Sequence, residues 1–287
     1  MCCRKEKSQS MNHEKNKKMA VRIFFFLLTL GLAMIIAFPF VWMIFASFKE
    51  SKEFYVLKPT LLPEKFNTDN FRELFEKLNI GLYYWNSVIV TAMQVLSTVT
   101  IVLLAGYGFA KYEFKGKNVL FLMILSSTMI PWVATIIPLY IMANQLKLVD
   151  TMAGLIIPGM ADAFSIFLAR NFMSSIPTPL LEAARIDGAG ELLIFRKIVI
   201  PAVKPLIAVI AIQKMVSSLN AFQWPLLVVN SDKLRTLPLA IAKLSSQYYD
   251  SYNLKMAAAA VAIIPVLIIY VIFQKYLVEG VSLSGIK

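Results

Sequence analysis

Residues 174–205 read SSIPTPLLEAARIDGAGELLIFRKIVIPAVKP, a charged and proline-containing stretch inside a chain that is otherwise strongly apolar. Pro177 and Pro179 end an incoming helix, and Pro179 fits the first turn of a new one. Apolar residues at helical spacing over positions 180–186 predict a short helix with one apolar side, beside which Glu182 projects. The stretch therefore begins with a short amphipathic helix.

A sharp turn and a second helix follow in the same stretch. Gly188 and Gly190 permit the turn, because glycine adopts backbone conformations that are closed to other residues. Helical spacing resumes over residues 191–198 and ends at Pro201. A helix-turn-helix with charged ends is suited to docking on another protein, and the alternative is an amphipathic linker lying at a membrane surface.

The composition excludes several classes of protein. Of the 287 residues, 58% are hydrophobic and 16% are charged, and the formal net charge is +12. Soluble domains are about 45–50% apolar, so a membrane protein is favoured over a soluble globule. The two cysteines, Cys2 and Cys3, are neighbours, and His13 is the single histidine. A disulfide scaffold, a zinc module and histidine-dependent catalysis are therefore excluded.

Six apolar runs are long enough to cross a bilayer, which takes about 20 helical residues. The runs cover residues 23–48, 85–110, 118–143, 152–172, 206–229 and 256–273. Internal prolines predict kinks, which are tolerated where neighbouring helices cover the freed carbonyl groups. These prolines are Pro39, Pro131, Pro138, Pro158, Pro225 and Pro265. The sequence thus predicts an all-α, polytopic bundle of six transmembrane helices around a cavity.

The distribution of Lys and Arg predicts the orientation of the bundle. An even number of spans places both termini on one side. Of the 29 Lys and Arg residues, 17 fall in segments on that side and 11 in the loops on the other. Cytoplasmic segments carry the excess of positive charge, so both termini are predicted to be cytoplasmic. Residues 1–22 then form a basic cytoplasmic tail, and residues 23–287 form the transmembrane domain.

The first apolar run is predicted to be retained, because it is too long for the core of a signal peptide and lacks an A-x-A cleavage site. Cys2 and Cys3 are interpreted as incidental thiols rather than acylation sites. The longest outer loop, residues 49–82, carries six basic and six acidic residues. It is either a lid or docking surface, or a plain solvated loop.

The spacing of residues 182–201 resembles the EAA loop of ABC-importer permeases. In that loop E-A-A is followed after three residues by Gly, and after nine more by I-x-L-P. The matching residues are Glu182, Ala183, Ala184, Gly188, Ile198 and Pro201. Asp187 fits the ARIDGA form that is common in the sugar-importer branch, and Ile200 replaces the usual Leu.

Three further segments are similar to parts of carbohydrate permeases such as those of the maltose importer. They are NSVIVT at residues 86–91, NAFQWPL at residues 220–226 and GVSLSGIK at residues 280–287. The family usually has Trp before the Asn of the second segment, where this chain has Leu219.

The resemblance implies the type I ABC-importer permease fold, with residues 177–201 as the coupling-helix loop. In the family this loop sits in a cleft on an ATP-binding subunit, with the Glu, here Glu182, at the contact edge and the Gly, here Gly188, allowing close packing. The implied partners are a dimer of cytoplasmic ATP-binding subunits, a second homologous permease and an extracytoplasmic solute-binding protein. The implied substrate is a sugar, and the implied location is the bacterial cell membrane.

The chain has no G-x-x-x-x-G-K-[ST] sequence, so it cannot hold a nucleoside triphosphate by that route. We therefore expect a transport subunit that is not itself an enzyme and has no cofactor of its own. The ATP and Mg²⁺ are expected in the partner subunit.

Polar side chains inside the spans are candidates for the substrate pathway, since polar groups in hydrocarbon are costly. Asn220, Gln223 and Trp224 are spaced to share or adjoin one helical face. Amides suit sugar hydroxyls, and an aromatic ring suits the C–H side of a sugar. The further candidates are Gln94, Ser97, Asp162, Ser165, Gln213 and Lys214.

These polar residues also have structural interpretations. Asn and Gln can join helices, and Trp224 can belong to an aromatic belt at the membrane interface. Asp162 can pair with Lys214 across the bundle, or each can face a wet cavity separately.

Other functions are less favoured by the sequence. A membrane-embedded enzyme would need a base, paired acids or a metal motif at membrane depth, but the only acid in a span is Asp162 and no span holds His. A secondary transporter working alone would be favoured by inverted repeats, and no clear repeat is present. A non-sugar solute is the alternative within the ABC importers.

Overall fold

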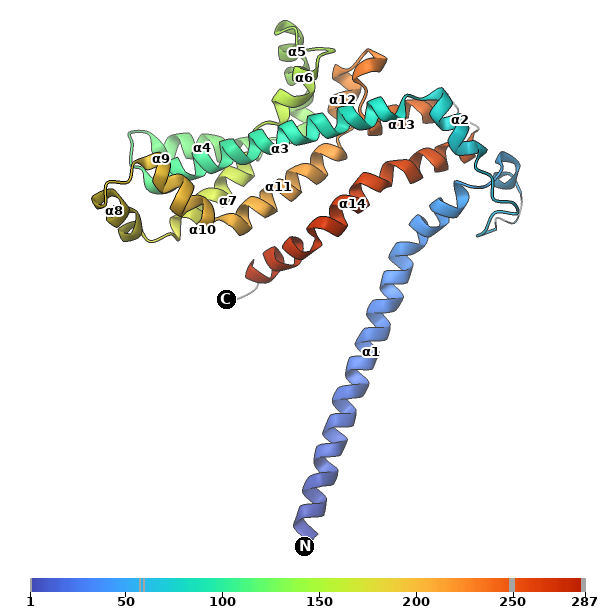
Figure 1. The fold of residues 1–287 in the computed structure, drawn as a ribbon, viewed down its shortest axis with the longest axis horizontal. Coiled ribbons are helices and arrows are strands. Elements are labelled where there is room, and N and C mark those ends of the chain that lie inside the picture. Colours follow the sequence, from blue (N-terminus) through green and yellow to red (C-terminus); the bar gives the residue numbers. More distant parts are fainter. Residues whose placement is uncertain (1, 57, 59, 248–250, 285–287) are drawn as a thin grey trace. The chain divides into compact units, whose positions relative to one another are not determined.

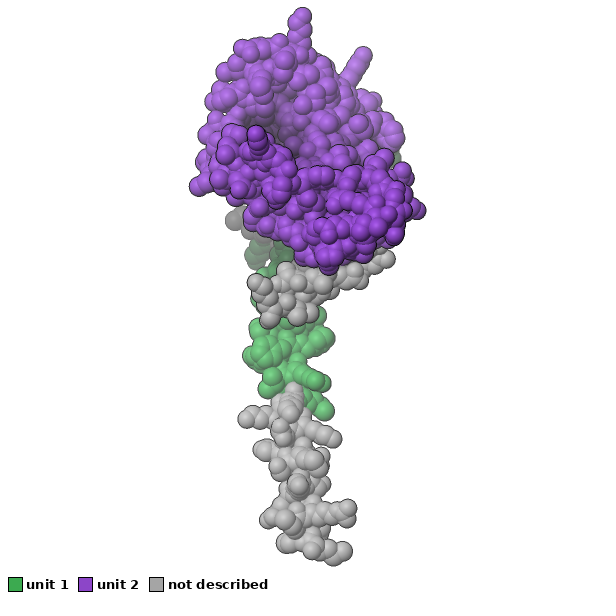
Figure 2. Space-filling model, turned by 90° about the vertical axis from the view of Figure 1, so that its left-hand side faces the viewer, with its two compact units in different colours: residues 1–74, 250–260 green, residues 75–249, 261–287 purple. Residues whose placement is uncertain are grey.

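The computed structural model describes residues 2–56, 58, 60–247 and 251–284. Within these ranges the side chains of residues 2–18, 20, 245–247, 266, 269–270 and 272–284 are not described. Cys2, Cys3, His13 and the segment 280–287 therefore have no described side chains. The chain divides into two units, residues 1–74 with 250–260 and residues 75–249 with 261–287 (Figure 2).

Regular structure in the described residues is helical throughout (Figure 1). The first unit holds α1 (Cys2–Ala46), η1 (Ser51–Phe54) and most of α2 (Asp69–Lys77). The elements that follow are α3 (Ile80–Lys111), α4 (Lys117–Ser127), α5 (Trp132–Gln145), α6 (Met152–Ile156), η2 (Ile157–Gly159), α7 (Ala163–Ser174), α8 (Thr178–Ile186), α9 (Glu191–Ile194), η3 (Phe195–Val199), α10 (Ile200–Ala202), α11 (Lys204–Leu219), α12 (Gln223–Val228), η4 (Asp232–Leu234), α13 (Leu237–Gln247) and α14 (Tyr252–Ser284).

The loop predicted at residues 49–82 contains Asn70, which is buried at the start of α2. Its Nδ2 donates to the carbonyl oxygens of Ser47 and Lys49, both at 2.8 Å. Its Oδ1 accepts from Nδ2 of Asn253 at 2.8 Å. One amide thus ties the end of α1, the start of α2 and the start of α14 together, which a plain solvated loop would not require.

In the second unit the long helix α3 packs against α7 and α11. The core between them includes Val102, Tyr107 and Ala169, which are at most 6% exposed. Gly106 brings α3 close to α7, because a Cβ built on it would lie 2.6 Å from Cβ of Ala169. This helix trio is the framework to which the other segments attach.

The predicted third span, residues 118–143, is not one straight helix. It consists of α4 and α5, which meet at an angle of 103°. Pro131 is the N-cap of α5, where a proline ends the preceding helix more readily than it kinks it. The kink predicted at Pro131 is therefore a break between two separate helices.

The fourth and fifth predicted spans are also divided. The segment α6 with η2 meets α7 at 43°, and Asp162 caps the new helix. Residues 220–222 separate α11 from α12. The second span is continuous in α3 and extends beyond residues 85–110 at both ends.

Two described helices, Val21–Ala46 within α1 and Ile80–Lys111, are long and apolar enough to cross a membrane, or up to four if each bent pair is one span. The all-helical, apolar character of the fold is confirmed. The number of six spans stays a prediction. The helices α2 and α13 in the outer loops were not predicted.

Candidate functional site

The short helix α8 is held by one side and free on the other. Leu181 is 1% exposed and belongs to the same core as α3 and α7, and Ala184 packs against that core. Glu182 and Ala183 are exposed, as is Asp187 just after the helix. The small side chain of Ala184 thus lets the helix approach the bundle, while Glu182 and Ala183 are exposed.

The end of α8 is a tight left-handed cap. Gly188 has φ +82°, and its N–H donates to the carbonyl of Arg185 at 3.0 Å. The N–H of Ala189 donates to the carbonyl of Ala184 at 2.9 Å. These two bonds make a Schellman motif, which requires the positive φ that glycine adopts without strain. Gly190, by contrast, is an extended N-cap with φ −69°.

The second part of the loop anchors it to the bundle. Ile194 and Val199 are at most 1% exposed, and Ile198 packs against the same core. The π-helical turn η3 ends at Val199, two residues before Pro201. Proline lacks an N–H, and its ring conflicts with a regular α-helical turn. Ile198 and Pro201 therefore shape the seating of the loop, and the helical segment continues to Ala202 rather than ending at Pro201.

A carboxylate at the start of α9 joins the loop to α3. Oε1 of Glu191 accepts from Nε of Arg185 at 2.7 Å, and its Oε2 accepts from the hydroxyl of Tyr107 at 3.1 Å. The hydroxyl of Tyr112 donates to the same Oε2. The Arg185 guanidinium and these hydroxyls lower the pKa of Glu191 to about 2, so the carboxylate stays ionised throughout the physiological range.

Four large apolar side chains of the loop are exposed. Ile186 is 86% exposed, Leu192 69%, Leu193 51% and Leu180 50%. Exposed large apolar side chains in a loop that also carries exposed charges are a feature of protein interaction surfaces. We call these four residues the apolar edge of the loop.

Two of the predicted pathway residues are buried between helices. Nε2 of Gln94 donates to the carbonyl of Leu155 at 2.9 Å, and a Cβ on Gly159 would lie within 2.4 Å of the Gln94 amide. Nε1 of Trp224 donates to the carbonyl of Gly154 at 2.8 Å. Both side chains are 8% exposed and join α3 or α12 to α6.

Asn220 and Gln223 are exposed at the break between α11 and α12. Nδ2 of Asn220 donates to the carbonyl of Val216 at 3.0 Å. Oε1 of Gln223 accepts from Nε1 of Trp132 at 3.1 Å. Trp132 begins α5 directly after the sharp bend, so the broken helix brings an indole to the Gln223 amide. Trp132 was not predicted as a site residue, because its partner is 91 residues away in the chain.

Asp162 and Ser165 form a helix cap. The backbone N–H of Ser165 donates to Oδ2 of Asp162 at 2.8 Å, and so does its hydroxyl. Among the ion pairs of the described residues none joins Asp162 to Lys214. Ser97 donates to the carbonyl of Met93 within its own helix, and Gln213 is exposed.

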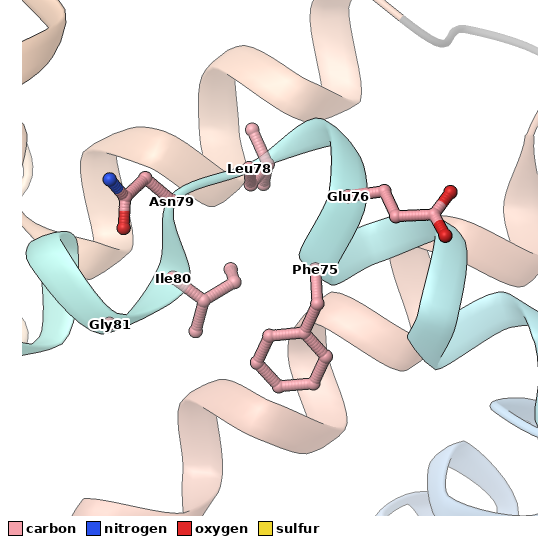
Figure 3. Close-up of a pocket in the computed structure, with 6 residues that line it drawn as sticks. All are labelled: Phe75, Glu76, Leu78, Asn79, Ile80 and Gly81. Atoms are coloured by element: carbon pink, nitrogen blue, oxygen red, sulfur yellow. The ribbon is translucent and has the colours of Figure 1, made fainter.

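An open hollow of about 370 Å³ lies at the turn from α2 to α3. The side chains of Phe75 and Ile80 face it, while Glu76 and Asn79 point away to either side (Figure 3). Phe75 is 54% exposed. The hollow is separate from the residues described above.

The comparison with known families decides the identity. The family described as "Binding-protein-dependent transport system inner membrane component" matches residues 102–283, more than half of the chain and including the whole loop. The chain belongs to this family of ABC-importer permeases. The expectation from the EAA sequence is confirmed at this level.

Related permeases cover nearly the whole chain. The arabinooligosaccharides transport system permease protein AraQ of Halalkalibacterium halodurans is 35% identical over 94% of this permease and 99% of its own length. The lactose transport system permease protein LacG of Rhizobium radiobacter is 30% identical over 87% of this chain and 90% of its own.

A solved structure has the same fold. A chain of a bacterial ABC transporter involved in the import of the acidic polysaccharide alginate superposes with a TM-score of 0.78 at 25% identity, covering 89% of this permease and 96% of that chain. The type I permease fold is thereby confirmed, and the chain is an inner-membrane transport component.

Proposed function

We propose that this permease is one half of the translocation pathway of an ATP-driven importer for a sugar or oligosaccharide. Relatives named for arabino-oligosaccharides, lactose and melibiose, raffinose and stachyose support the substrate class. A non-sugar solute is the alternative. The other half of the pathway would be a second, homologous permease subunit.

The single observation that carries the coupling role is the seating of α8. Leu181 is fixed in the core, while Glu182, Ala183 and the apolar edge face outward. A helix that is packed against the bundle on one side and exposed on the other can transmit a displacement of a docked subunit to the bundle. We propose that the docked subunit is a dimer of ATP-binding subunits, which holds the ATP and Mg²⁺.

The remaining partners follow from the same proposal. An extracytoplasmic solute-binding protein would deliver the sugar to the outer side. One solved relative of this fold, at 17% identity, was crystallised with an alginate pentasaccharide-bound periplasmic protein. The loop of this permease would then face the cytoplasm together with both termini, as the charge distribution predicts.

Purification of the tagged chain in mild detergent tests the assembly. We expect an ATPase with a Walker sequence and a second permease to co-purify. Recovery of this chain alone, as a homo-oligomer that moves solute without ATP, would contradict the proposal and favour a secondary transporter.

The variant Glu182→Lys tests the docking edge. Reversal of an exposed charge leaves the packed side of α8 intact, so the chain should insert at normal abundance. We expect ATP-dependent uptake to fall at least tenfold, measured with labelled arabino-oligosaccharide, lactose and raffinose in vesicles. Glu113→Gln, which alters another exposed carboxylate, is the control. Normal uptake by Glu182→Lys would show that α8 does not dock through this residue.

For the substrate pathway we propose Asn220 and Gln223, with Trp132 beside them. Their exposure leaves hydrogen-bonding capacity for a sugar, whereas the buried amide of Gln94 and the indole of Trp224 already bond to backbone carbonyls. Asp162 serves as a helix cap in this arrangement and is a weaker candidate.

Asn220→Ala and Gln223→Ala should raise the half-saturating sugar concentration about three- to tenfold with assembly unchanged, since a lost hydrogen bond costs about 0.5–1.5 kcal/mol. Uptake titrations across the same sugar panel measure this. Asn118→Ala, which changes an exposed amide at the start of α4 outside the candidate pathway residues, is the control. Unchanged titrations for both variants would assign the two amides to helix association.

A further inference from the structure

The carboxylate of Glu191 is the one group in the described cytoplasmic-loop region that bonds to α8 and to the end of α3 at the same time. We propose that Glu191 is a positioning residue that locks α8 to α3, so that a displacement of α8 moves α3. This inference rests on the coupling role proposed above, and it names the route from the loop into the bundle.

The two carboxylate oxygens of Glu191 bond to different helices. Oε1 accepts from Arg185 of α8 at 2.7 Å. Oε2 accepts from Tyr107, near the end of α3, at 3.1 Å, and from Tyr112, which caps α3. Because each oxygen bonds to a different helix, the Glu191 carboxylate holds α8 and the end of α3 at a fixed separation.

A further hydrogen bond joins α3 to the loop. Nζ of Lys111, the last residue of α3, donates to the carbonyl of Ile176, just before α8. Leu181 of α8 also lies in the core that contains Tyr107. The end of α3 is therefore bonded to the residue Ile176 before α8 and to Glu191 after α8.

The exposure of the Arg185–Glu191 pair indicates that it orients α8 relative to α3 and adds little to the stability of the fold. The side chains of Arg185 and Glu191 are 38% and 46% exposed, so water screens their attraction. Tyr107, in contrast, is 6% exposed and its ring packs at 5.3 Å from that of Phe195. Removing a hydroxyl from this buried ring should leave the packing in place, which makes the proposal testable without unfolding.

The connection continues from α3 to the pathway residues. The helix is in rigid contact with α7 at Gly106 and Ala169, and it packs along α11, whose end carries Asn220. A shift of α3 is thus passed to the helices that hold the proposed sugar contacts, because a close-packed interior transmits displacement rather than absorbing it.

The test uses the co-purified complex with Cys2→Ser and Cys3→Ser, and with Ser97→Cys as a reporter in the middle of α3. The rate at which a maleimide modifies the reporter is measured with and without ATP and vanadate, and ATP hydrolysis is measured in parallel. We expect ATP with vanadate to change the rate about fivefold or more in this parent.

The decisive variant is Tyr107→Phe with Tyr112→Phe. It removes both α3 hydroxyls but keeps the rings and the pair of Glu191 with Arg185. We expect unchanged basal ATP hydrolysis and loss of most of the response at the reporter. Glu191→Ala should lose the response as well, and Glu191→Gln should retain part of it, because the amide oxygen still accepts a hydrogen bond. Tyr84→Phe removes a hydroxyl at the other end of α3 and is the control.

The outcomes separate this inference from the proposed function. If no ATPase accompanies the parent complex, the coupling role itself fails. If the parent hydrolyses ATP but the reporter does not respond, transmission through α3 is wrong. If parent, Tyr107→Phe with Tyr112→Phe, and Glu191→Ala all respond equally, Glu191 is not a positioning residue.

Discussion

Gly188 and Gly190 look alike in the sequence and differ in the fold. Gly188 has φ +82° at the cap of α8, whereas Gly190 has an ordinary φ of −69° at the start of α9. A Cβ on either glycine would meet no atom within 4 Å. The difference between them is therefore one of backbone conformation alone, and only Gly188 needs to be glycine.

Gly188→Ala should destabilise the cap by about 1–2 kcal/mol, because a Cβ in the left-handed region is strained. Gly190→Ala should be within about 0.5 kcal/mol of the parent. Thermal unfolding of the purified chain measures both, and uptake should fall with Gly188→Ala only. Equal melting temperatures for the two variants would mean that the positive φ is not needed.

The sequence predicted the site where the determinants are local. Glu182, Ala183, Ala184 and Gly188 lie within one turn or two of each other, so their spacing suffices. Glu191 meets Tyr107 and Tyr112, which are 84 and 79 residues away, and no local pattern marks such a contact. The only local feature that marks Glu191 is an acidic residue in the first turn of a helix.

In helix α3, the close approach of one neighbour, α7, depends on a single small residue. At Gly106 a Cβ would lie 2.6 Å from Cβ of Ala169 and 3.2 Å from its backbone carbonyl carbon. Backbone atoms of α7 cannot rotate away as a flexible side chain would. At Gly108, two residues on, a Cβ would meet nothing within 4 Å.

Gly106→Ala should therefore push α3 and α7 apart and cost about 1–3 kcal/mol, as overpacking does. Gly108→Ala should be neutral or stabilising by up to about 1 kcal/mol, because alanine favours helix. Thermal stability of the purified chain in detergent distinguishes the two. A Gly106→Ala variant as stable as Gly108→Ala would contradict the close approach of α3 and α7.

Apolar runs predicted where helices occur but not where they break. The run at 118–143 contains enough apolar residues for one span, yet Pro131 starts a new helix and the two halves meet at 103°. The angle depends on what packs around the bend, which periodicity does not encode. The outer helix α2 was missed because residues 49–82 are rich in charge and were treated as a loop.

The distribution of Lys and Arg predicts which side of the membrane each loop faces, which hydropathy does not predict. Lys65 is predicted to lie in an outer loop, whereas Lys115 and Lys197 are predicted to lie in inner segments with the positive excess. All three side chains are exposed. Their accessibility from either side of the membrane therefore reports the orientation directly.

With Cys2→Ser and Cys3→Ser, an impermeant maleimide should label Lys65→Cys in intact cells, and should label Lys115→Cys and Lys197→Cys only after permeabilisation. The ratio of labelling before and after permeabilisation is the measurement. Labelling of Lys197→Cys in intact cells would reverse the orientation and place the loop on the wrong side for an ATPase.

The bend between α4 and α5 has a consequence for how the cell handles this permease. Helices of 11 and 14 residues are about 17 and 21 Å long, so each alone is shorter than the hydrocarbon layer. At the bend Met129 is 82% and Ile130 54% exposed in the isolated chain. Irregular backbone at membrane depth is tolerated only where other protein or a wet cavity covers it. We therefore predict that a copy made without the proposed partner permease leaves this bend uncovered and is degraded by membrane quality-control proteases, so that its abundance follows the supply of the partner rather than its own rate of synthesis.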